Sequence, residues 1–218
     1  MTEKDIKIKL IEFMIKKNNH DIIVPEVTVG HKSSDHKQVR SDIFAINGDI
    51  SIYEIKSEKD SLQRLSNQIE NYKEYANRVN IVVAEKFLPK LNLDDAIGIY
   101  SVNSRGVKEI KPAKSQNCNC ENILEYWLSN ELKDFLRGYK GISKLDKEEL
   151  KNKIKFLLNE VQIYNATLLM LKKRYIKESN IIKNQIQNNS LESFPKRGLS
   201  INSNTTPLKD IPFGYLMP

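Results

Sequence analysis

The pattern of apolar and polar positions changes from a helical to a strand period within the first thirty residues. Between residues 4 and 17, apolar side chains recur at steps of three and four, which predicts an amphipathic helix. Residues 22–30 are almost continuously apolar and predict a first strand, which Glu26 interrupts. A carboxylate in such a run needs a partner, and if Glu26 lies on an exposed strand face, Arg40 can supply one.

A β-hairpin is predicted next. Residues 41–46 and 50–56 are rich in β-branched and aromatic side chains, and the Asn-Gly-Asp sequence between them is typical of a turn. Residues two apart point to the same face of a strand, so Glu54 and Lys56 project together. Asp42 lies on the partner strand, where the hairpin can bring it beside them.

The hairpin is followed by an alternation of helix and strands. A helix is expected over residues 61–76, with Ser57 or Asp60 as its cap. Further strands are expected at residues 78–84, 97–102 and 107–110. This succession predicts an α/β fold with helices flanking a central sheet.

The second half of the chain is predominantly helical. Residues 111–117 form a polar linker, and helical periods follow over residues 123–136 and 147–183. The apolar seam of the longer helix needs a partner, either the core or a second copy of the chain in a homodimer. From residue 184 the chain is rich in Asn, Ser and Pro without periodicity. We therefore predict a core over residues 1–110, a helical extension over 119–183 and a mostly disordered tail over 184–218.

Composition narrows the class of protein. The 218 residues are 39% hydrophobic and 29% charged, which is typical of a globular protein. No apolar run approaches the roughly 20 residues that cross a bilayer, and the first residues lack the apolar core of a signal peptide. We expect no membrane contact and a cytoplasmic location. Cys118 and Cys120 have no second Cys or His pair near them, so we expect free thiols.

The net charge of +7 is unevenly placed. Residues 1–110 carry 17 basic and 17 acidic residues, whereas residues 111–218 carry 18 and 11. A basic excess favours binding to a phosphate backbone, although solvated lysine-rich helix faces have the same composition.

Two carboxylates and a lysine in otherwise apolar strands are costly to bury without a purpose. Asp42 and Glu54 offer the hard oxygen ligands that Mg²⁺ takes, and Lys56 can stabilise developing charge or orient a water molecule. The simpler interpretation is an ordinary Asp with a Glu–Lys pair on a half-exposed sheet.

The order of these residues resembles the core of the PD-(D/E)xK nuclease superfamily, which includes restriction endonucleases. The shared features are an Asp, a turn, an apolar-Glu-x-Lys strand and a helix, and they are most similar to a bacterial and phage branch. Ser41 stands where the motif has proline. The resemblance covers about the first half of the chain and implies a restriction-endonuclease-like core with a mixed central sheet. It assigns catalysis to Asp42, Glu54 and Lys56.

The same resemblance implies a cofactor and its ligands. Asp42, Glu54, the carbonyl group of Ile55 and Glu26 would hold Mg²⁺, for which Mn²⁺ can substitute. Arg40 would bind the substrate phosphate, a task that suits its planar guanidinium.

The helix after the hairpin adds two candidate substrate-binding residues. The resemblance places Gln68 next to the scissile phosphate and gives Arg64 a lesser role in substrate binding. Hydrogen bonding on the helix surface is the alternative for both residues.

Two classes of function remain. The first is a Mg²⁺-dependent nuclease that hydrolyses phosphodiester bonds in DNA. The second is an inactive module that binds nucleic acid or protein on the same fold, because fold does not fix function. A subunit that assembles through its C-terminal helices is a third interpretation.

Overall fold

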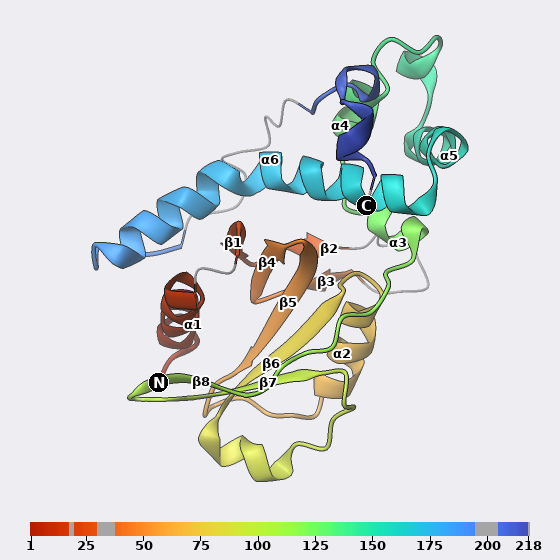
Figure 1. Ribbon diagram of the computed structural model, residues 1–218. Coiled ribbons are helices and arrows are strands. Elements are labelled where there is room, and N and C mark those ends of the chain that lie inside the picture. Colours follow the sequence, from red (N-terminus) through yellow and green to blue (C-terminus); the bar gives the residue numbers. More distant parts are fainter. Residues whose placement is uncertain (18–19, 30–37, 195–204, 218) are drawn as a thin grey trace.

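The computed structural model describes residues 1–17, 20–29, 38–194 and 205–217, and a mixed six-stranded sheet lies at its centre (Figure 1). The strands are β1 (Ile22–Pro25), β2 (Thr28–Val29), β3 (Val39–Arg40), β4 (Ile43–Asn47), β5 (Asp49–Lys56), β6 (Arg78–Ala84), β7 (Gly98–Asn103) and β8 (Gly106–Lys111). The large sheet has the order β1-β4-β5-β6-β7-β8, and β2 pairs with β3 in a separate ribbon.

Helices flank this sheet. The α-helices are α1 (Glu3–Lys17), α2 (Leu65–Lys73), α3 (Cys120–Leu124), α4 (Ser129–Phe135), α5 (Lys147–Leu157) and α6 (Glu160–Gln187). The short 3-10 helices are η1 (Glu85–Lys90), η2 (Ile142–Lys144), η3 (Leu208–Asp210) and η4 (Phe213–Tyr215). The predicted α/β class, with a mixed sheet between helices, is confirmed at this level.

The predicted hairpin is present as β4 and β5, which pair antiparallel with Asn47 opposite Asp49. Gly48 between them has φ +69°, in the left-handed region where glycine has no steric penalty. The strands β5, β6 and β7 then run parallel, and β8 returns antiparallel. The α2 helix forms the crossover between β5 and β6, and η1 forms the next.

The alternation of β5 divides the core into two layers. Ile50 and Ile52 enter a hydrophobic cluster with the buried face of α2, whereas Tyr53 and Ile55 enter a second cluster with α1. Figure 1 shows α1 and α2 on opposite sides of the sheet. Glu54 and Lys56 therefore lie on the α2 side, as their positions in the strand predict.

The long helix α6 covers the edge of the sheet at β1 (Figure 1). The backbone N–H of Ile23 donates a hydrogen bond to the hydroxyl of Ser179, at 2.9 Å and fully buried. The ammonium of Lys183 donates to the carbonyl oxygens of His20 and Asp21, at 3.0 and 2.9 Å. These contacts satisfy backbone groups at an edge that would otherwise be open to another strand.

Two elements near the hairpin differ from their predictions. The strand expected over residues 22–30 is interrupted between β1 and β2, because Glu26 has φ +56° and leaves the extended conformation. The helix expected over residues 61–76 is shorter in the structure, where α2 covers only Leu65–Lys73. Asp60 does not cap it, since its carboxylate accepts hydrogen bonds from the backbone N–H and the hydroxyl of Ser57 at 2.7 and 2.6 Å.

The helices of the second half are more broken than predicted. The helix expected over residues 123–136 is divided into α3 and α4. The helix expected over residues 147–183 is divided into α5 and α6, because Leu158 is extended and Asn159 caps a new helix. The Asn159 side chain accepts from the backbone N–H of Gln162, which completes a capping box.

The α6 helix continues to Gln187, beyond the predicted start of the disordered tail. Residues 205–217 of that tail contain η3 and η4, and Leu216 is buried. The amide of Asn165 on α6 lies 3.3 Å from the carbonyl oxygens of Leu216 and Met217. Residues 205–217 of the predicted tail therefore pack against α6, while residues 195–204 lie outside the described part of the chain.

One hydrophobic cluster joins the predicted core and the helical extension. It includes Phe44 of β4, Trp127 between α3 and α4, and Leu171 of α6. The apolar seam of α6 thus packs against the sheet of the same chain. The homodimer stays a prediction. The division into domains also stays a prediction. No helix in the described ranges is long and apolar enough to cross a membrane.

Candidate functional site

Asp42 lies where two adjacent strands are interrupted together. It falls between β3 and β4, and Glu26 falls between the neighbouring β1 and β2. The backbone N–H of Glu26 donates to the carbonyl oxygen of Asp42 at 3.1 Å, and that of Ser41 donates to Val27 at 2.9 Å. These bonds hold Glu26 in a left-handed conformation that a non-glycine residue adopts only at a cost.

The hairpin register brings the two predicted metal-binding acids together. Ile43 pairs with Tyr53, so the next position places Asp42 opposite Glu54. The Oδ2 atom of Asp42 also accepts a hydrogen bond from the backbone N–H of Ile55 at 2.7 Å. Burial, followed by the nearby charge of Glu54, raises the pKa of Asp42 to about 7.

Glu54 and Lys56 form a buried ion pair with Gln68. Glu54 is 4% exposed and Lys56 is 9% exposed. The Nζ atom of Lys56 lies 2.7 Å from Glu54 Oε1. Gln68 on α2 donates from Nε2 to the same oxygen at 2.6 Å and accepts from Lys56 at 2.9 Å. The three predicted residues therefore meet in one triangle of hydrogen bonds.

Tyr72 completes the surroundings of Glu54. Its hydroxyl lies 2.6 Å from Glu54 Oε2 and 2.9 Å from the carbonyl oxygen of Arg40. Burial and then the charge of Glu54 raise the pKa of Tyr72 above its ordinary range, so the hydroxyl keeps its proton. Sequence analysis assigned Tyr72 no role in the site. Its four-residue step from Gln68 was the available signal, because such residues share one helix face.

Lys7 on α1 also reaches the site, and sequence analysis did not identify it. The residue is only 3% exposed, and its ammonium lies 3.1 Å from Glu26 Oε1 and 3.7 Å from Asp42 Oδ1. It lies 2.6 Å from Glu3, one helical turn earlier. The signal for its burial is its position three residues before Leu10, within the apolar arc of the helix.

The two predicted arginines are exposed. Arg40 lies 3.7 Å from Glu26, and 67% of its side chain is accessible. This contact is the ion pair expected if Glu26 is not a metal ligand. Arg64 is exposed at the residue before α2 and takes part in none of the contacts described above. The ligand role of the Ile55 carbonyl group stays a prediction, whereas its N–H group clearly positions Asp42.

The donor set fits a hard divalent cation. Two carboxylates face each other across neighbouring strands, and their mutual repulsion is the kind that Mg²⁺ would relieve. In the described part of the chain, no three acidic, His or Cys side chains stand close enough to hold a metal together. A metal here would be held by the carboxylates of Asp42 and Glu54, together with backbone or water oxygens. Mg²⁺ commonly uses one or two carboxylates.

Comparisons with known proteins give a family for the chain. The family described as Bacteriophage P4 protein cII matches residues 1–194. Protein cII of Enterobacteria phage P4 is 30% identical over 204 residues, which cover 87% of this chain and 74% of that relative.

A solved structure from Silicibacter pomeroyi, of a protein of unknown function, has 16% identity and a TM-score of 0.42. The match covers 55% of this chain and 77% of that one, and the likeness is too slight to support an argument. The extent of the sequence match, by contrast, is decisive: this chain belongs to the family of bacteriophage P4 protein cII.

Proposed function

We propose that the protein is a Mg²⁺-dependent nuclease that hydrolyses phosphodiester bonds in DNA, with a restriction-endonuclease-like core and a PD-(D/E)xK-type site. The observation that carries the proposal is the placement of Asp42 opposite Glu54, with Lys56 on the same face and bonded to Glu54. A buried cluster of these three residue types is costly as a purely structural device, and metal-assisted hydrolysis uses all of them.

Each residue has a distinct task in this proposal. Asp42 and Glu54 would hold the metal, which would supply Lewis-acid stabilisation of the phosphate, while Glu26 stays paired with Lys7 and Arg40. Lys56 orients the attacking water and stabilises negative charge on the phosphate. Gln68 fixes the ammonium of Lys56 by accepting its hydrogen bond at 2.9 Å, which limits the positions that this charge can take.

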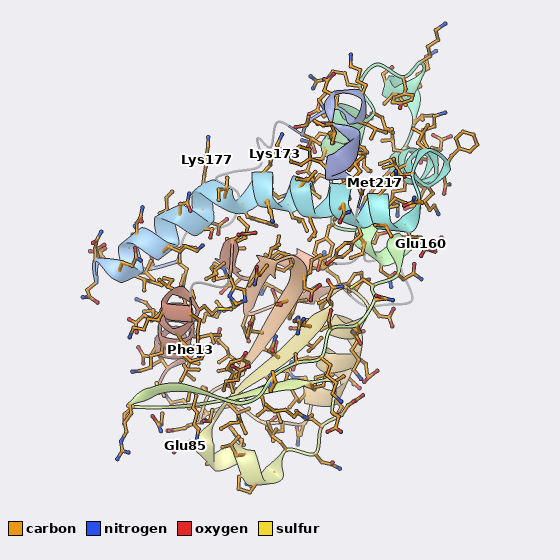
Figure 2. All side chains as sticks on the ribbon, viewed as in Figure 1. Phe13, Glu85, Glu160, Lys173, Lys177 and Met217 are labelled. Atoms are coloured by element: carbon orange, nitrogen blue, oxygen red, sulfur yellow. The ribbon has the colours of Figure 1, made fainter. Side chains whose placement is uncertain are left out.

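Arg40 is the residue best placed to contact the substrate backbone. Its side chain is exposed, and its carbonyl oxygen is anchored by Tyr72 beside Glu54. Figure 2 shows Lys173 and Lys177 of α6 pointing away from the sheet, so these lysines do not line the site. They would contact DNA only where it extends beyond the cleavage position.

A cleavage assay with single substitutions tests the proposal. Supercoiled, linear and branched DNA and single-stranded RNA are incubated with Mg²⁺ or Mn²⁺ and the purified protein. We expect Asp42→Asn, Glu54→Gln and Lys56→Met each to reduce DNA cleavage by about 100-fold or more. Asp95→Asn, at a side chain 88% exposed, is the matched control and should cleave normally. Cleavage that survives all three substitutions would refute the assignment.

An inactive binding module is the second candidate, favoured by one observation. Both carboxylate oxygens of Glu54 already have partners, in Lys56, Gln68 and Tyr72, as in a closed structural network. Such a protein would bind nucleic acid equally well with Mg²⁺ or with a chelator. A melting temperature that Mn²⁺ raises in the unmodified protein, but not in Asp42→Asn, would exclude this candidate.

A further inference from the structure

A buried ammonium already occupies part of the proposed metal site. Lys7 Nζ lies 2.6 Å from Glu3, 3.1 Å from Glu26 and 3.7 Å from Asp42. The three carboxylates come from α1, from the interruption between β1 and β2, and from the interruption between β3 and β4. A positive charge placed between two distant strand segments and a helix is bound there by the fold rather than by local sequence.

The chemistry of Lys7 matches that of a competing cation. Lysine is seldom buried unless paired, and its compact ammonium has three donors on a flexible stem. The Asp42 oxygen near which it lies belongs to one of the two carboxylates that would hold Mg²⁺. An ammonium 3.7 Å from an Asp42 oxygen repels a divalent ion that would bind the same carboxylate.

A position for the displaced ammonium is also present. Glu3 lies one helical turn before Lys7, its side chain is 52% exposed, and it makes the shortest of the three contacts. Arg40 lies 3.7 Å from the other oxygen of Glu26 and can keep that carboxylate oriented. The ammonium can therefore withdraw towards Glu3 without becoming a buried, unpaired charge.

We propose that Lys7 is an internal cation that lies beside Asp42 in the metal-free protein and withdraws from it when a divalent metal binds. Lys7 then lowers the affinity of the site for the metal. This inference rests on the proposed function, because it concerns the same metal site.

Binding of Mn²⁺ in the absence of nucleic acid tests this role. Free Mn²⁺ is measured by electron paramagnetic resonance during titration of the unmodified protein, Lys7→Met and Lys16→Met. Lys16 lies on the same helix, is exposed, and makes none of the site contacts. Removing the charge of Lys7 should lower the Kd for Mn²⁺ at least tenfold, while Lys16→Met leaves it unchanged. Circular dichroism checks folding, and Lys7→Gln replaces Lys7→Met if the latter does not fold.

The outcomes separate the two proposals. Equal or weaker Mn²⁺ binding by the Lys7 variants than by the unmodified protein would overturn the role of Lys7 and leave the nuclease proposal standing. Absence of Mn²⁺ binding in every variant would overturn the metal site itself. A second measurement follows the ¹⁵N-labelled ammonium of Lys7 by NMR, and its signal should shift when Mg²⁺ is added. If the protein binds Mg²⁺ and the NMR signal of the Lys7 ammonium does not shift, displacement of Lys7 by the metal is contradicted.

Discussion

Two of the buried ion-pair clusters in the described part of the chain are built differently. Between α4 and α6, Arg174 meets Glu131, which is fully buried. The Nε atom of Arg174 donates to Glu131 Oε1 at 2.9 Å, and a second guanidinium nitrogen bonds the other oxygen and the carbonyl of Tyr126. Glu131 also accepts from the backbone N–H of Leu128 at 2.9 Å. One acid and one base thus satisfy each other.

The cluster around Asp42 does not balance in the same way. Burial alone would lower the pKa of Arg174, yet Glu131 raises it above its ordinary value, so that pair favours its charged form. Burial and the neighbouring Glu54 instead raise the pKa of Asp42 to about 7, so its charged form is disfavoured despite Lys7. The comparison shows that the pair of Arg174 and Glu131 favours its charged form, whereas the charged form of Asp42 beside Glu54 is disfavoured.

The largest expected effect is on the satisfied pair. Glu131→Ala leaves the guanidinium of Arg174 buried without its acid, and we expect the free energy of unfolding to fall by about 3–5 kcal/mol. Urea unfolding followed by circular dichroism measures the loss. The double variant Glu131→Leu with Arg174→Met should recover most of it, because no charge remains buried. A loss below about 1 kcal/mol in the single variant would mean that the pair is not as isolated from water as its burial indicates.

The second prediction concerns the pH dependence of the metal-free protein. The pKa of Asp42 is higher in the folded state than its ordinary value of 3.8, so its protonation stabilises the folded state at low pH. That contribution is lost as the pH rises through about 7. Asp42→Asn removes the penalty, and at pH 8 we expect it to be more stable than the unmodified protein, on the order of 2 kcal/mol. Below pH 4 the two should unfold alike in urea, and parallel curves at every pH would contradict the shift.

Tyr72→Phe is expected to have a smaller effect on stability. The substitution removes the hydroxyl that meets Glu54 Oε2 and the carbonyl oxygen of Arg40. Loss of one buried donor should cost about 1 kcal/mol in thermal or urea unfolding. Tyr215→Phe is the control, because Tyr215 is exposed. An unchanged stability for Tyr72→Phe would indicate that water replaces the hydroxyl.

Arg40→Ala should change stability least, by less than about 0.5 kcal/mol, because its ion pair with Glu26 is exposed. Its effect is expected in DNA binding instead. If Arg40 contacts a phosphate, the Arg40→Ala variant should show a smaller slope of log Kd against log salt concentration. The decrease should correspond to the loss of roughly one phosphate contact. Fluorescence anisotropy with labelled duplex DNA at several salt concentrations measures this slope, and an unchanged slope would remove Arg40 from the interface.

The central hairpin was predictable because its information is local. The turn at Gly48 and the alternation of β5 determine which residues share a face, and the register then brings Asp42 opposite Glu54. The place of Gln68 next to the site was implied by the family resemblance, and Gln68 does contact Glu54 and Lys56.

Other features depend on packing between distant segments. The contacts of Lys7 with Glu26 and Asp42 require α1 to lie at the two strand interruptions, which no local pattern states. The left-handed conformation of Glu26 is not a property of its residue type. The break before α6 was visible as an Asn159-x-x-Gln162 capping box, but the apolar period continues across it.

The hydroxyl of Ser179 has one more consequence, for the newly made chain. It meets Ile23 across 156 residues of sequence, so the edge of β1 is uncovered until α6 has been translated. At 5–20 residues per second, that interval lasts roughly 8–30 s. During this time the edge of β1 lacks the contacts that α6 supplies. The last long helix of the chain is therefore also the step that ends its exposure to misassembly on the ribosome.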